Sequence, residues 1–299
     1  IKQLDDSGDV PVVGLGSRQG PADRLERRVA DARTGRTLPD ARQTQIPHRR
    51  MHSLYGHPST SPHRELGEQG PIESVERVTA LAASFEDYSA EPVLPACENI
   101  ATVASGTAGP DGDYSNETPI DVLRPYVDAA ADGGVYVVLD LQPGRSDFVS
   151  QAKEYEELLA LPHVGLALDP EWRLRPDQVH LEQIGSVTAA EVNEVADWLA
   201  TLTRERALPQ KLLLLHQFQQ RMIIDRPTLD LSHDELAVVV QMDGDGTPAD
   251  KDATWRALRA DAPEGLLFGW KNFYDEDTPT FTPEQTMGVN PTPWWVSYQ

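Results

Sequence analysis

Two carboxylic acids and a tryptophan directly follow one short apolar run. Residues 164–168 read VGLAL, and the chain continues with Asp169, Pro170, Glu171 and Trp172. Two carboxyl groups this close can serve as proton donor and charge stabiliser, the roles that cleavage of a glycosidic bond requires. An apolar ring beside Glu171 would disfavour the ionised carboxylate and keep that side chain protonated near neutral pH. The stretch is therefore a candidate acid–base site.

Similar side chains end or follow the other apolar runs of the sequence. They include Tyr55, His57, Glu98, Asp140, Gln142, His216, Gln217, Asp243, Trp270 and Lys271. Each of them singly is unremarkable, since chain segments that leave a sheet are commonly polar. Their recurrence at run after run predicts one shared cleft. We expect Glu171 to be the general acid, Asp169 and Asp140 to be nucleophile or stabiliser, and Trp172 with the residues named above to bind substrate.

The element that would gather these side chains is a barrel of parallel strands. Eight apolar runs span residues 50–56, 92–104, 134–141, 164–169, 211–218, 235–243, 265–273 and 293–299. Nearly continuous apolar character is typical of strands that are buried on both faces. Amphipathic stretches alternate with the runs, which predicts a single (β/α)8 barrel of the TIM type, with its active site at the carboxyl ends of the strands. The rival, an open doubly wound sheet, needs a glycine-rich first turn, and GLGSRQG at 14–20 lacks the spacing.

Helix signals support the alternation. Apolar residues share one face over 73–88 and over 188–203, and the second stretch opens with Thr188 and Glu191, the pattern of a capping box. Thr282 followed by a proline predicts another helix start. The sequence ends at the eighth run, so the last helix of the barrel is expected to be missing.

The first 48 residues differ from the rest in composition. They are rich in Arg, Asp, Gly and Pro, with one candidate strand at 10–16 and one candidate helix at 21–32. This predicts an N-terminal extension or linker over 1–48, which could cover the place of the missing helix, and a barrel domain over 49–299.

Charge and composition exclude several classes of protein. The 299 residues carry a formal net charge of −22, which argues against nucleic-acid binding and suits an acid-lined cleft. No apolar run approaches the ~18 residues of a membrane span. Cys97 is the one cysteine, so no internal disulfide forms. The chain begins at Ile1 rather than Met, as a processed product would.

Two other functions compete with the glycosidase hypothesis. His57, Glu98, Asp140 and His216 could hold a metal ion for a metal-dependent hydrolase, although no His-x-His or His-Glu-x-x-His spacing supports it. A barrel that binds glycans without cleaving them would keep the same cleft. The segments 111–116 and 243–252 resemble fragments of calcium loops but lack the terminal Glu. The favoured prediction includes no metal and no cofactor.

Two resemblances add to this interpretation. Asp169 and Glu171 are similar to the end of the acidic motif of chitinase-type glycoside hydrolases, where the Glu is the acid and the preceding Asp assists; the upstream acids of that motif are absent, with Leu166 and Ala167 in that region. The segments LYGHP, VVLDLQPGRSDF, HVGLALDPEWRL, LPQKLLLLHQF, GWKNFYDED and VSYQ resemble a family of uncharacterised exported bacterial proteins, many of them lipoproteins. That resemblance covers nearly all of 51–299.

The resulting expectation is a glycoside hydrolase or related carbohydrate-active enzyme that acts on extracellular or cell-envelope glycans. Its partner would be a carbohydrate, with no nucleic acid and no transmembrane segment. The second resemblance implies a protein that is secreted or lipid-anchored at the cell surface, cut near the start of the extension.

Overall fold

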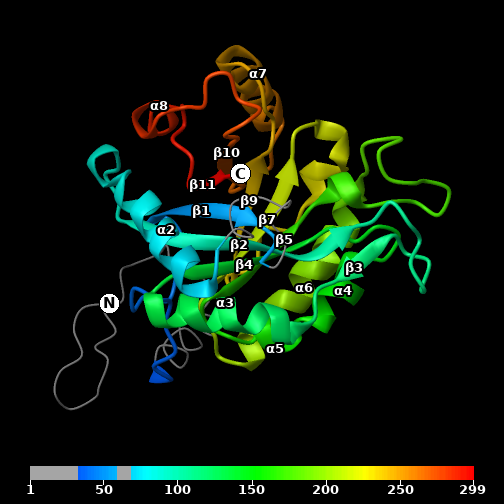
Figure 1. The fold of residues 1–299 in the computed structure, drawn as a ribbon, viewed down its shortest axis with the longest axis horizontal. Coiled ribbons are helices and arrows are strands. Elements are labelled where there is room, and N and C mark those ends of the chain that lie inside the picture. Colours follow the sequence, from blue (N-terminus) through cyan, green and yellow to red (C-terminus); the bar gives the residue numbers. More distant parts are fainter. Residues whose placement is uncertain (1–32, 59–68) are drawn as a thin grey trace.

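Eight parallel strands close into a barrel. The computed structural model describes residues 33–58 and 69–299. The barrel strands are β1 (Arg50–Gly56), β2 (Val93–Ala104), β4 (Tyr136–Leu141), β5 (Val164–Leu168), β7 (Lys211–Gln217), β9 (Leu236–Met242), β10 (Leu267–Asn272) and β11 (Trp295–Tyr298). Each pairs with the next, and β1 closes the ring because Met51 pairs with Trp295 of β11 and with Leu94 of β2. The predicted (β/α)8 barrel of the TIM type is confirmed (Figure 1).

Helices connect most successive strands on the outside of the barrel (Figure 1). They are α2 (Pro71–Ala83), α3 (Ile120–Gly133), α4 (Phe148–Glu154), α5 (Glu156–Leu159), α6 (Ala189–Glu205), α7 (Pro248–Arg259) and α8 (Pro283–Met287). Between β7 and β9, the chain instead forms two 3₁₀ turns, η5 (Gln220–Met222) and η6 (Arg226–Thr228), and the short strand β8 (Ile223–Ile224). No helix follows β11 in the described part of the chain, as expected.

The predicted helix starts are partly right. Thr188 caps α6 by accepting a hydrogen bond from the Glu191 N–H at 3.1 Å. The Glu191 carboxylate does not complete the box, because it binds Arg173 at 2.9 Å. Thr282 and Gln285 form a complete box on α8. The helix expected over 73–88 ends as α2 at Ala83, and residues 86–88 form the 3₁₀ turn η3.

Large inward side chains fill the amino-terminal half of the barrel. Tyr136 and Trp295 are fully buried there. Gly165 makes room for Tyr136, since a Cβ at 165 would lie 2.8 Å from the Tyr136 hydroxyl. Gly269 likewise faces Trp295, whose Cβ would lie 3.0 Å from an added methyl group. This half is therefore solid core, and space for a ligand remains at the carboxyl ends of the strands.

Residues before β1 pack against the same end of the barrel. Leu38 is 1% exposed and belongs to the cluster of apolar side chains that includes Met51 and Trp295. The buried Arg49 binds Asp40 at 2.6 Å. The strand expected at 10–16 and the helix expected at 21–32 lie outside the described residues, and the domain boundary at 48 stays a prediction. Among the residues described, no helix has the length and apolar character needed to cross a membrane.

Candidate active site

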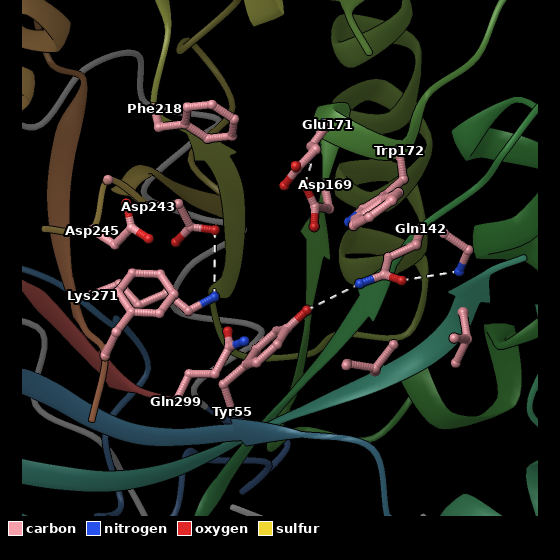
Figure 2. A pocket seen from close by; sticks show the side chains of 15 residues that line it. Tyr55, Gln142, Asp169, Glu171, Trp172, Phe218, Asp243, Asp245, Lys271 and Gln299 are labelled. Atoms are coloured by element: carbon pink, nitrogen blue, oxygen red, sulfur yellow. Dashed lines mark hydrogen bonds and ion pairs between the residues drawn. The ribbon is translucent and has the colours of Figure 1, made fainter. Parts of the chain in front are cut away.

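A cavity of about 410 Å³ opens at the carboxyl ends of the barrel strands. Its lining comprises Tyr55, Ile100, Val103, Ala104, Gln142, Asp169, Glu171, Trp172, Phe218, Asp243, Gly244, Asp245, Lys271, Phe273 and Gln299. Figure 2 shows the acids on two walls, with Asp169 and Glu171 on one and Asp243 and Asp245 on the other, and the Lys271 amine next to Asp243. The cavity is large enough for a small molecule and is lined by converging polar groups, as binding sites are.

Strand geometry explains which side chains reach the cavity. Alternate residues of a strand point to opposite faces. Tyr136 and Val138 fill the lower barrel, so Asp140 on the same strand also points inward. Leu212 and Leu214 likewise place His216 inside. In both strands the inward positions therefore change from apolar to polar toward the carboxyl end.

A chain of buried ionisable groups crosses the barrel beneath the cavity. His216 Nε2 lies 2.6 Å from Glu98 Oε1, and His216 Nδ1 lies 2.7 Å from Asp243 Oδ2. Ser297 donates to the other Glu98 oxygen at 3.1 Å. Burial by itself would lower the pKa of His216, but Asp243 and Glu98 outweigh burial and raise that pKa well above its usual value. The imidazole therefore has one carboxyl group at each of its two ring nitrogens.

Lys271 links this chain to the cavity. Its Nζ lies 3.4 Å from Asp243 Oδ2 and 3.9 Å from the centroid of the Tyr55 ring. Burial would raise the pKa of Asp243, but His216 and Lys271 overcome burial and lower it. Asp243 is therefore ionised, and an ammonium group with three N–H donors keeps capacity for a ligand oxygen.

Asp140 lies under Tyr55 and is completely buried. The Tyr55 hydroxyl donates to Asp140 Oδ2 at 3.0 Å, and Gln142 Nε2 donates to the Tyr55 oxygen at 3.2 Å. Burial raises the pKa of Asp140 to about 7, with His216 lowering it and Glu98 raising it. Asp140 Oδ1 has no hydrogen-bond partner.

Asp169 and Glu171 form one wall of the cavity. They lie where β5 ends and the 3₁₀ turn η4 (Pro170–Trp172) begins. Asp169 caps this turn by accepting from the Glu171 N–H at 3.3 Å. Burial raises the pKa of both carboxyls, and nearby acids add to the effect, with Asp140 acting on Asp169 and Asp243 on Glu171. Two carboxyl groups with raised pKa values therefore face the cavity.

The structure separates the predicted site residues into three groups. Seven line the cavity: Tyr55, Gln142, Asp169, Glu171, Trp172, Asp243 and Lys271. Glu98, Asp140 and His216 are inward but lie one layer deeper, out of the lining. They touch the lining through Tyr55 and Asp243.

Three predicted residues do not line the cavity. Trp270 points outward because its neighbour Lys271 points inward, and its ring packs between Trp255 and Phe281 outside the barrel. Gln217 is next to the inward His216 and binds backbone carbonyls and Arg226 outside. His57 follows β1 and binds Thr118 at 2.9 Å.

Sequence reasoning missed several residues that line the cavity, and their positions along the strands could have identified four of them. Phe218, Phe273 and Gln299 each lie two residues beyond an inward side chain, namely His216, Lys271 and Ser297. The period of two along a strand continues into the first loop residues. Asp245, two residues past Asp243, follows the same rule.

Comparisons with known proteins give little beyond the fold. No protein-family model and no curated protein matches the chain. Among solved structures, the chain is similar to an HpcH/HpaI aldolase from Desulfitobacterium hafniense DCB-2, with 12% sequence identity and a TM-score of 0.37. The match covers 84% of this chain and 85% of the aldolase chain.

The prediction of a glycoside hydrolase is contradicted, because the two expected partners of Glu171 are unsuitable as ionised carboxylates. Asp140 lies outside the cavity lining, and burial raises the pKa of Asp169 well above its usual value. The alternative hydrolase set is also incomplete, because His57 is not part of the group formed by Glu98, Asp140 and His216.

Proposed function

We propose that this protein is an enzyme that transfers a proton to or from a small substrate with a carbonyl or carboxylate oxygen. One observation carries the proposal: the cavity holds Lys271 and the raised-pKa carboxyl of Glu171 around the same space (Figure 2). A fixed cation and a proton-exchanging acid are the two groups that enolate chemistry needs.

Lys271 would receive the substrate oxygen. Its charge is positioned by Asp243 at 3.4 Å and by the Tyr55 ring, so little reorganisation accompanies binding. Negative charge that develops on a carbonyl oxygen when a neighbouring carbon loses its proton is stabilised by such a preorganised donor. Lys271 therefore acts on the oxygen end of the substrate.

Glu171 would exchange the proton with carbon. As a carboxylate it removes a proton from the carbon beside the carbonyl; as a carboxylic acid it returns one. A raised pKa suits both directions, because proton transfer is efficient when the pKa of the group is near the working pH. Asp169 holds the turn that carries Glu171 by accepting its N–H. Isomerisation and carbon–carbon bond cleavage both proceed through this step.

The test is solvent deuterium incorporation. Purified protein is incubated in D2O with a panel of small 2-oxo acids, 3-oxo acids and hydroxyketones, and loss of the substrate proton signal is followed by NMR. We expect exchange on at least one compound, and we expect Glu171→Gln to slow it by about 10²- to 10⁴-fold, the usual worth of a positioned acid or base.

The matched control is Glu182→Gln, which removes the same charge at an exposed position. It should leave the exchange rate unchanged. An equal rate for Glu171→Gln and the unmodified protein would exclude Glu171 from the proton transfer. Absence of exchange and of binding across the whole panel would contradict the substrate class. Export to the cell surface stays a prediction that this test does not address.

A further inference from the structure

Three buried side chains converge beneath the cavity floor. Glu98 comes from β2, Asp140 from β4 and His216 from β7, and all three are fully buried. One oxygen or nitrogen atom from each lies within 4.8 Å of the others. Three ligands of one ion, with bonds of about 2.0–2.4 Å, have separations in this range.

The orientation of His216 fits a ligand. Asp243 lies 2.7 Å from Nδ1, so it can accept the Nδ1 proton and leave Nε2 to face Glu98 and Asp140. A carboxylate behind the imidazole is the usual support of a metal-bound histidine, because it fixes the tautomer and the ring orientation.

Asp140 supplies an independent observation. Its Oδ2 accepts from Tyr55, but its buried Oδ1 has no hydrogen-bond partner and lies 3.8 Å from His216 Nε2. A buried carboxylate oxygen without a partner carries a large desolvation cost, so such an atom marks a place where a ligand or ion is expected.

Carboxyl groups outnumber basic groups in and under the cavity. The carboxyl groups in and under the cavity are Glu98, Asp140, Asp169, Glu171 and Asp243. The basic groups among them are His216 and Lys271. This excess of acids in a water-poor interior is costly unless protons or a cation compensate it.

We propose that Glu98, Asp140 and His216 bind one divalent metal ion inside the barrel, directly beneath Tyr55. One imidazole and two carboxylates suit Mn²⁺ or Zn²⁺, since imidazole favours transition metals and carboxylates suit Mn²⁺. The proposal does not depend on the reaction proposed above, since it concerns binding by residues below the cavity lining.

The experiment measures metal uptake by the full chain. The protein is stripped with a chelator and dialysed, Mn²⁺ is added, and bound metal is quantified by mass spectrometry and calorimetry. We expect one tightly bound ion per chain in the unmodified protein. Asp140→Asn and Glu98→Gln keep side-chain size, and each should weaken metal binding by at least about 100-fold. Loss of a residue that only hydrogen-bonds to a metal ligand already lowers metal affinity by about 10- to 100-fold.

The control uses the second acidic group with a histidine, formed at the surface by Asp197, Asp230 and His233. His233→Gln should retain the tight site. Pulsed electron paramagnetic resonance on Mn²⁺-loaded His233→Gln protein should then show one directly bound imidazole nitrogen, and this readout needs no change to the buried group. Failure of His233→Gln protein to bind Mn²⁺ or Zn²⁺ at millimolar concentration, or unchanged binding by folded Asp140→Asn protein, would overturn the proposal.

Discussion

Lys271 Nζ lies 3.4 Å from Asp243 Oδ2, where a single carboxylate faces both this ammonium and the imidazole of His216. Asp243 thus contacts two basic side chains, and Glu98 lies 2.6 Å from the imidazole on its other side. The alternation of charges positions Lys271 without cancelling its ability to donate toward the cavity.

Lys271→Met should keep the length of the side chain and remove its charge. We expect the deuterium exchange rate on a confirmed substrate to fall by about 10²- to 10³-fold, as it does when one preorganised donor to an oxyanion is lost. Lys153→Met, at an exposed position, is the control and should retain the full rate. A Lys271→Met protein that is folded and fully active would show that the substrate oxygen binds elsewhere.

Gly165→Ala should destabilise the barrel. The added Cβ would lie 2.8 Å from both the Tyr136 hydroxyl and the Leu212 carbonyl oxygen, and the backbone atom cannot move away cheaply. Overpacking of this kind costs about 1–3 kcal/mol of unfolding free energy. Urea denaturation measures it, and Gly106→Ala, with nothing within 4 Å of the new methyl group, serves as comparison. Equal stability of the two variants would contradict the packing described here.

Leu38→Ala tests the contribution of residues that precede the first strand. Leu38 is 1% exposed and packs in the lower barrel core, so its truncation should cost about 2–5 kcal/mol. Leu181→Ala is the matched control, because Leu181 is 88% exposed. If Leu38→Ala unfolds at the same urea concentration as Leu181→Ala, the segment before β1 does not stabilise the barrel.

Lys211 should make the free energy of unfolding depend on pH. Burial lowers the pKa of its amine to about 7 from 10.5, and Nζ donates to the Leu161 and Val164 carbonyls. Between these values the unfolded chain binds more protons than the folded one, so stability rises with pH across this window, by at most about 1.4 kcal/mol per pH unit.

The measurement compares urea unfolding of the unmodified protein and Lys211→Met from pH 7 to pH 9. The difference in unfolding free energy should shift in favour of the unmodified protein as pH rises. A constant difference would mean that Lys211 stays protonated in both states.

The strands could be predicted because each is a nearly continuous apolar run, and their bounds differ from the observed ones by at most about two residues. Sequence also placed Asp169 and Glu171 correctly, since residues two apart near a strand end share a face. The sequence alone could not show which of two adjacent residues points into the barrel. Of Trp270 and Lys271, one side chain must point into the barrel and the other away from it. Packing with Tyr136 and Trp295 inside the barrel determines which one points inward, and the local sequence pattern does not.

The sequence also did not reveal how far inside the barrel each polar side chain lies. Glu98 lies six residues before the last residue of β2, so it is inside the barrel rather than at the rim. The interaction of Glu98 with His216 joins residues far apart in the chain, and only barrel closure brings them together. The glycosidase prediction failed for a related reason: residue types indicated acids, but which acids face an open cavity depends on the fold.

The proposed reaction requires that the cavity raise the pKa of Glu171, and titration of this carboxyl group tests that requirement most directly. The carboxyl carbons of glutamate are labelled with ¹³C, the Glu171 signal is assigned by its loss in Glu171→Gln, and its shift is followed from pH 3 to pH 9 in metal-free protein. Because burial and Asp243 oppose ionisation, the account predicts a Glu171 pKa above the usual 4.5. A pKa at or below 4.5 would contradict it.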